Sequence, residues 1–190
     1  MEKNLTYCVK AFDEIYSDSA NRYRLCCHAN VNKSISHMTT DNTLPFEYFL
    51  SKEMEKIRDD MFDGKKIDGC EGCYNDEEIN GYSHRTKFNE ESDYNAGDVT
   101  KVSTKLKNFG SRCNLGCYMC RPYDSSTRRQ ELKDAGLIDT WNNLGLDEFE
   151  REWVKNVSSK DVEIFNQNIL DNIDKVRQIR IFGGEPVLLD

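Results

Sequence analysis

The 190-residue sequence lacks any long apolar segment and is poor in basic residues. No apolar run approaches the roughly 20 residues that a transmembrane helix requires. The N-terminus, MEKNLTYC, lacks the apolar stretch of a signal peptide. We therefore expect a cytoplasmic protein that does not enter a membrane. The 34 acidic residues outnumber the 26 basic ones, and the net charge of −8 argues against non-specific nucleic-acid binding, which needs a basic surface.

Cysteine, in contrast, is abundant. In a chain without an export signal, eight cysteines favour metal or redox chemistry over disulfides, although disulfide pairing remains the alternative. The cysteines fall into four groups along the chain: Cys8, then Cys26 and Cys27, then Cys70 and Cys73, and finally Cys113, Cys117 and Cys120.

The last group has the spacing C-x3-C-x2-C within Cys113-Asn-Leu-Gly-Cys117-Tyr-Met-Cys120. Three sulfurs so spaced can converge on one centre, whereas a structural zinc site or an ordinary [4Fe–4S] cluster takes four ligands. The missing ligand suggests a cluster with an open iron that can bind a reacting molecule. A zinc knuckle, or three unrelated buried cysteines, is the alternative.

A second motif lies near the end of the sequence. Arg180-Ile-Phe-Gly-Gly-Glu-Pro186 is a short apolar strand that runs into Gly-Gly-Glu-Pro. Gly183 and Gly184 allow the backbone to approach a ligand closely, and Glu185 offers an acceptor to an ammonium group. Taken alone, the same residues would also suit an ordinary turn at the end of a strand.

Hydrophobic periodicity predicts the surrounding elements. A helix is expected over residues 45–63, with Pro45 at its first position and Gly64 after its end. Its apolar stripe consists of Phe46, Phe49, Leu50, Met54, Ile57 and Met61. A second helix should follow the C-x2-C turn of Cys70 and Cys73. A third should begin at a cap formed by residues 124–127 and run to about residue 135. A strand at 99–108, a helix marked by apolar residues from Ile164 to Val176 and a strand at 178–182 predict a βαβ unit with parallel strands.

Together, the cysteine loop and Gly-Gly-Glu-Pro resemble the radical S-adenosylmethionine (SAM) enzymes, whose loop reads C-x3-C-aromatic-x-C, with Tyr118 here as the aromatic residue. The resemblance implies an α/β fold in which residues 96–190 form the start of a partial (β/α)6 barrel. Compared with that barrel the chain is truncated within the core, so whether it is active alone is an open question. It also implies a [4Fe–4S] cluster on Cys113, Cys117 and Cys120. SAM would bind near Tyr118, Gly183, Gly184, Glu185 and Pro186 and yield a 5′-deoxyadenosyl radical. An electron donor such as flavodoxin or ferredoxin is expected; the substrate, a small molecule or a peptide, is not defined.

Residues 1–95 resemble the twitch or SPASM-like module of some radical SAM proteins, a small α+β metal-binding unit. The matching residues are Cys8 with Phe12, Cys26-Cys27, Cys70-Glu-Gly-Cys73-Tyr74 with Glu78, and Gly81-Tyr-Ser83-His-Arg85. The resemblance implies an auxiliary [4Fe–4S] cluster on Cys8, Cys70, Cys73 and one of Cys26 and Cys27. Adjacent residues in a strand point to opposite faces, and we expect Cys26, which follows Arg22-Tyr-Arg-Leu, to be the ligand. Zinc in the same four thiolates, giving a zinc-stapled binding module without catalysis, is the alternative.

Overall fold

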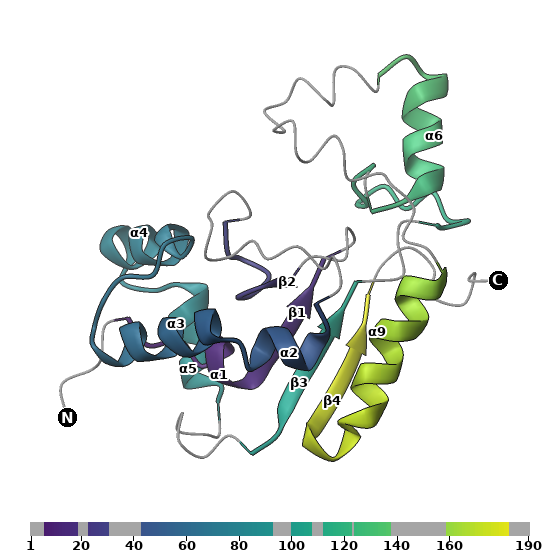
Figure 1. Ribbon diagram of the computed structural model, residues 1–190. Helices are drawn as coiled ribbons and strands as arrows, with labels where there is room; N and C mark the ends of the chain where they lie inside the picture. Colours follow the sequence, from purple (N-terminus) through teal and green to yellow (C-terminus); the bar gives the residue numbers. More distant parts are fainter. Residues whose placement is uncertain are drawn as a thin grey trace.

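A computed structural model shows an α/β fold with one small open sheet (Figure 1). The structure describes residues 6–18, 23–30, 43–92, 100–107, 112–122, 124–137 and 159–182. The sheet has the order β2-β1-β3-β4, with β1 at Glu14–Ser17, β2 at Tyr23–Arg24, β3 at Val102–Leu106 and β4 at Val176–Ile181. The β1–β2 pair is antiparallel, and the other two pairs are parallel.

The sheet joins the two segments that the sequence analysis assigned to separate domains. Strand β1 belongs to residues 1–95 and β3 to residues 96–190, yet they pair in parallel, with Ile15 opposite Thr104. The four described strands thus form one mixed sheet across the predicted boundary. The division into a twitch-like module and the start of a barrel remains a prediction.

Strands β3 and β4 confirm the predicted parallel pair. The helix before β4 is α9, Ser159–Asp171, and a 3-10 turn at Ile173–Lys175 follows it. The prediction placed Ile173 and Val176 in the helix, and this was wrong. The helix ends because the side chain of Asn172 donates to the carbonyl of Asn168 at 2.9 Å, while the amide of Lys175 donates to the carbonyl of Asn172.

The single helix predicted at 45–63 is two helices, α2 at Pro45–Phe49 and α3 at Lys52–Phe62. Ser51 between them has an extended backbone, and its side chain accepts from the amide of Met54 at 3.3 Å, so it caps a new helix. Leu50, predicted to lie on the apolar stripe, is 67% exposed as a result. The rest of the stripe is buried, and Gly64, at φ +75°, follows the end of α3 as expected.

The other described helices are α1 at Lys10–Asp13, α4 at Glu71–Asn80, α5 at His84–Glu90 and α6 at Ser126–Asp134. Helix α4 begins directly after Cys70, as the C-x2-C turn predicted. Within the predicted cap of α6, Ser125 accepts from the amide of Arg128 at 3.2 Å. In Figure 1, α3, α4 and α5 gather near α1, whereas α6 stands apart beyond the upper end of the strands.

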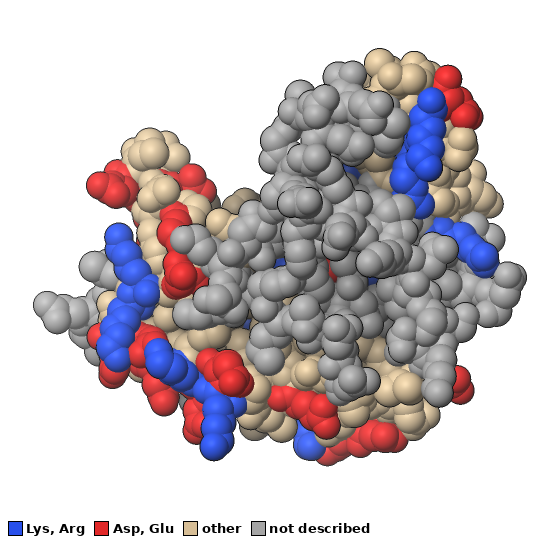
Figure 2. Space-filling model, turned by 45° about the horizontal axis from the view of Figure 1, so that its top comes forward, with Lys and Arg blue, Asp and Glu red and all other residues tan. Residues whose placement is uncertain are grey.

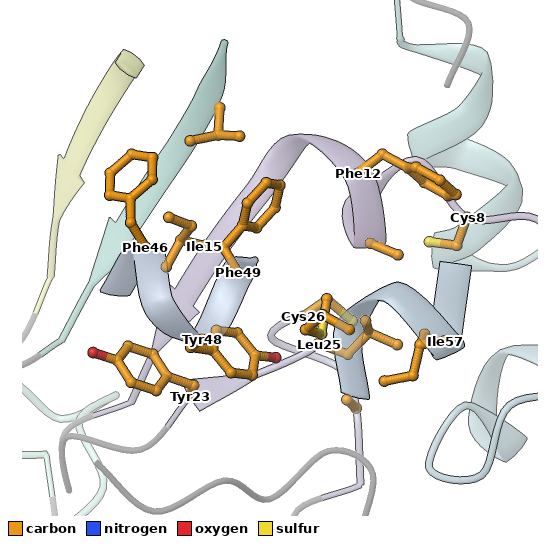
Figure 3. Close-up of a cluster of buried hydrophobic side chains, with 14 of the residues drawn as sticks. Cys8, Phe12, Ile15, Tyr23, Leu25, Cys26, Phe46, Tyr48, Phe49 and Ile57 are labelled. Atoms are coloured by element: carbon orange, nitrogen blue, oxygen red, sulfur yellow. The ribbon is translucent and has the colours of Figure 1, made fainter. Parts of the chain in front are cut away.

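Helices α2 and α9 pack together over the hydrophobic core. The amide of Phe46 donates to the side chain of Asn168 at 3.1 Å, which joins the two helices. Tyr23 stacks on Tyr48 with ring centroids 4.7 Å apart, and Phe165 lies 6.0 Å beyond Tyr23. Figure 3 shows Tyr23 and Tyr48 in the same cluster as Ile15 from β1, with the sulfurs of Cys26 and Cys8 further along it. Burial of each such side chain contributes about 1.5–3 kcal/mol.

None of the described helices is long and apolar enough to cross a membrane.

Candidate metal centres

The cysteine loop and the Gly-Gly-Glu-Pro segment follow the carboxyl ends of two neighbouring strands, β3 and β4. The loop follows β3, and Phe182, the residue before Gly183, donates its amide to the carbonyl of Leu106 at the end of β3, at 2.7 Å. The predicted SAM-binding residues Gly183, Gly184, Glu185 and Pro186 themselves lie outside the described residues. In open α/β sheets, ligands bind outside the carboxyl ends of the strands, which is where these two segments start.

The start of α6 anchors the cysteine loop. The amide of Cys113 donates to Ser126 Oγ at 3.0 Å, and the Cys113 carbonyl accepts from the hydroxyls of Ser126 and Thr127. Ser125 Oγ donates to the carbonyl of Leu115 at 3.3 Å. The three hydroxyl residues that begin α6 therefore also fix the conformation of the loop. Basic side chains follow along the helix at Arg128, Arg129 and Lys133, and Figure 2 shows blue side chains on α6 at the upper right.

The three thiols of this loop share one environment. The Cys113 sulfur accepts from the amide of Leu115 at 3.4 Å. Burial raises the pKa of Cys120, and Cys117, Asp124 and Cys113 raise it further. Cys117 is exposed to solvent. The sulfurs thus lie close enough to affect one another at an open surface, where a molecule could reach a metal held between them.

Tyr118 is 88% exposed, so its ring is available to a ligand. The guanidinium of Arg128 lies 5.7 Å from the ring centroid and covers one face. This position next to Cys117 is where the resemblance expects the adenine of SAM.

The N-terminal cysteines form a second group. Burial raises the pKa of Cys8, and the thiols of Cys26, Cys70 and Cys73 add to that effect. Burial likewise raises the pKa values of Cys26 and Cys70 to about 12, and that of Cys73 as well. The thiols of Cys26, Cys70 and Cys73 all act on Cys8, which indicates that side chains from three distant stretches of sequence lie near one another.

A backbone contact joins the Cys26 turn to the Cys70 turn. The amide of Asn30 donates to the carbonyl of Gly69 at 2.8 Å. Gly69 has φ +93°, a left-handed conformation that disfavours any residue with a Cβ. This glycine therefore lets the chain turn immediately before Cys70.

Helix α5 holds the turn that carries Cys8. Arg85 and Asn89 both donate to the carbonyl of Tyr7, at 2.7 and 2.8 Å. Asn89 also accepts from the amide of Val9 at 2.8 Å. The polar side chains of one helix thus fix the backbone on both sides of Cys8.

Glu77 is a site residue that the sequence analysis missed. Its carboxylate accepts from Ser83 Oγ at 2.5 Å and pairs with the guanidinium of Arg85, whose Nε lies 2.9 Å away. The backbone of Arg85 and the side chain of Ser83 in turn lower the pKa of Cys73, against the rise caused by burial. The motif comparison had pointed to Glu78, which is exposed. The i, i+4 spacing from Cys73 to Glu77 was the available signal, since it places both on one helix face.

Cys26 and Cys27 have different surroundings. Cys26 is buried in the core beside Cys8, whereas Cys27 is only half-buried. The thiol of Cys27 adds to the rise that burial causes in the pKa of Tyr16, on the polar face of the sheet. Burial raises the pKa of Cys26 most, and the thiol of Cys27 adds to that rise, so the choice of Cys26 as the ligand remains a prediction.

The environment of the second group suits a closed all-thiolate site. Burial raises the pKa values of Cys8 and Cys26, and hydrogen bonds to their sulfurs from the amides of Lys10 and His28, each two residues after a cysteine, partly offset that rise. Such bonds stabilise metal-bound thiolates. Within the described ranges, no three Cys, His, Asp or Glu side chains already stand in a ligand arrangement.

Comparison of the chain with protein-family models, with curated proteins and with solved structures gave no match.

Proposed function

We propose that this chain is a radical SAM protein, with one [4Fe–4S] cluster on Cys113, Cys117 and Cys120. The observation that supports this most is the contact between Phe182 and Leu106, because it starts the cysteine loop and the Gly-Gly-Glu-Pro segment at adjacent strand ends. Those three cysteines would hold the cluster, and the chemistry that it would supply is the one-electron cleavage of SAM, which would give a radical able to abstract a hydrogen atom from a substrate.

In this proposal, the residues of the chain bind the cluster and orient SAM. Three thiolates hold the cluster and leave one iron for SAM, while Ser125, Ser126 and Thr127 fix the loop. The exposed ring of Tyr118 offers a flat surface to the adenine, and Glu185 accepts from the ammonium of the methionine part. A small molecule or peptide would be the substrate, and flavodoxin or ferredoxin the class of electron donor.

The second group, Cys8, Cys26, Cys70 and Cys73, holds an auxiliary [4Fe–4S] cluster in the same proposal. Four thiolates complete such a cluster, so this site would anchor substrate or pass electrons and would not bind SAM. Burial, hydrogen bonds from backbone amides and the all-sulfur donor set support the assignment, and the same donor set also suits zinc.

Metal analysis of the anaerobically purified chain separates these possibilities. The proposal predicts iron and acid-labile sulfide in equal amounts, about eight of each per chain for two [4Fe–4S] clusters. Zinc without sulfide would contradict the radical SAM assignment and would favour the zinc-stapled binding module. Iron and sulfide at half that level, together with one zinc, would place the cluster in the loop and zinc at the N-terminal site.

A further inference from the structure

A hollow of about 230 Å³ lies on the charged face of the sheet, and none of the eight cysteines lines it. Its lining comes from α1, from α5 and the residues after it, from β3 and from β4. In β3, Val102, Thr104 and Leu106 alternate with Ser103 and Lys105, so the latter two lie on the face opposite the core. The described residues that line it are Lys10, Asp13, Phe88, Glu91, Ser92, Lys105, Arg177 and Arg180.

Buried carboxylates hold three of the four cations of this hollow. Glu14, whose side chain is 1% exposed, lies 2.8 Å from Lys105 Nζ and 3.4 Å from Lys10 Nζ. Asp13 lies 3.3 Å from Lys10 Nζ and 3.2 Å from Arg177. The two carboxylates thus hold Lys10, Lys105 and Arg177 in place at the wall of the hollow.

Arg180 is the fourth cation, and its situation differs. Its Nε donates to Gln178 at 2.8 Å, and within the described part of the chain it forms no ion pair. The strand register sets it directly beside Lys105, on the same face of the sheet. Like charges in neighbouring register positions are destabilising, so this pair is costly unless an anion lies between them.

Charge and shape together define the ligand. Among the described residues, four cations face three carboxylates, Asp13, Glu14 and Glu91, which gives this part of the surface an excess of positive charge although the chain is acidic overall. The Phe88 ring lies 5.2 Å from Lys10 Nζ and 5.9 Å from Lys105 Nζ and forms an apolar wall beside the cations. The volume is below the roughly 300–1,000 Å³ of drug-sized pockets, which favours a small molecule.

We propose that this hollow binds a small molecule that carries a carboxylate or phosphate group beside a flat apolar body. The oxyanion lies between Arg180 and Lys105, where the guanidinium donates two parallel hydrogen bonds, and the apolar body packs on Phe88. This site does not depend on any metal, so it stands or falls separately from the proposed function.

Calorimetry on the full chain tests the site with phenylacetate, phenyl phosphate and the uncharged phenylacetamide. We expect at least one anion to bind, and phenylacetamide to bind about tenfold more weakly or not at all, because a charge-assisted contact is lost. The anion that binds more tightly shows whether the hollow prefers a carboxylate or a phosphate. Equal binding of phenylacetamide, or no binding of either anion, would overturn the proposal.

Arg180→Gln is the decisive variant, and Lys175→Gln, outside the hollow and just before β4, is its matched control. Arg180→Gln should weaken anion binding about tenfold or more, and Lys175→Gln should leave it unchanged. Without ligand, Arg180→Gln should melt at the parent temperature or above it, since one of two adjacent like charges is removed. A lower melting temperature with unchanged affinity would show that Arg180 serves the fold and would refute the site.

Discussion

Phe182 donates its backbone amide to the carbonyl of Leu106 at 2.7 Å and so extends the parallel pairing to the last residue before Gly183. Two segments that the sequence separates by about 70 residues therefore leave the sheet side by side. One carries three thiols and the other carries Gly-Gly-Glu-Pro. The predictions that follow test what these segments and the N-terminal cysteines bind.

Cys117→Ser should lower the iron content by about half, since it removes one of only three ligands of the loop cluster and leaves the N-terminal site intact. Cys27→Ser is the matched control, because Cys27 lies outside both proposed sets of ligands. Iron and sulfide analysis of anaerobic preparations is the measurement. Equal iron in Cys117→Ser and the parent would remove Cys117 from the ligand set.

Cys26→Ser should abolish the N-terminal metal site and destabilise the chain by at least about 3 kcal/mol, because metal binding contributes to folding. Cys27→Ser should keep both the metal and the stability, since Cys27 lies outside the proposed ligand set and is less buried than Cys26. Metal stoichiometry and thermal unfolding of the full chain compare the two variants. The reverse ranking would make Cys27 the ligand.

Glu77→Ala should destabilise the chain by about 2–3 kcal/mol, because it leaves the buried Arg85 without its anionic partner. Glu78→Ala, one position along and exposed, should change stability by less than about 0.5 kcal/mol. Since Ser83 and Arg85 also contact Cys73, Glu77→Ala should weaken metal retention during titration with a chelator. Equal effects of the two substitutions would show that the Glu77 contacts contribute little.

Acid should weaken the same network. Although burial raises the pKa of Glu77, hydrogen bonds from Arg85 and Ser83 lower it below the ordinary 4.5. A depressed pKa gives stability that is present above 4.5 and is lost as the pH falls through the folded-state value. In denaturant unfolding below pH 4.5, Glu77→Gln should therefore lose less stability than the parent. Parallel curves for the two proteins would contradict this role of the carboxylate.

Alkaline pH should destabilise the metal-free chain. Burial raises the pKa values of Cys26 and Cys70 from 9.0 to about 12, so unfolding releases their protons once the pH exceeds 9. Stability should therefore fall from pH 9 upward in the presence of a chelator, and less so in the metal-loaded chain, whose thiols are already deprotonated. Denaturant unfolding at about pH 8, 9 and 10, with and without chelator, is the measurement, because these values bracket the ordinary pKa of a thiol. Identical curves for the two forms would contradict metal binding by these thiols.

Local signals in the sequence predicted the elements around the candidate sites well. Spacing and capping residues predicted the helix after Cys70, the Ser125 cap of α6 and the parallel β3–β4 pair. The helix at 45–63 failed because apolar periodicity continues through Ser51, whose side chain caps a new helix instead. Periodicity describes which face is buried, and it does not reveal a break between two helices that bury the same face.

The pairing of β1 with β3 could not be predicted from the sequence. Nothing near Ile15 or Thr104 indicates that their strands are neighbours, because the pairing is decided by the packing of the whole core. The grouping of Cys8 with Cys70 and Cys73 was expected only through resemblance, whereas the Arg85 and Asn89 contacts to Tyr7 that hold it in place carry no local pattern. The charged hollow likewise depends on the register that sets Arg180 beside Lys105.

Electron paramagnetic resonance of the dithionite-reduced, anaerobically purified chain tests the central claim most directly. An open iron on the Cys113–Cys120 loop predicts the signal of a reduced [4Fe–4S] cluster whose g-values shift when SAM is added. The shift should be absent in Cys117→Ser and present in Cys27→Ser. A cluster signal that SAM leaves unchanged in the parent chain, or no iron–sulfur signal at all, would contradict the account.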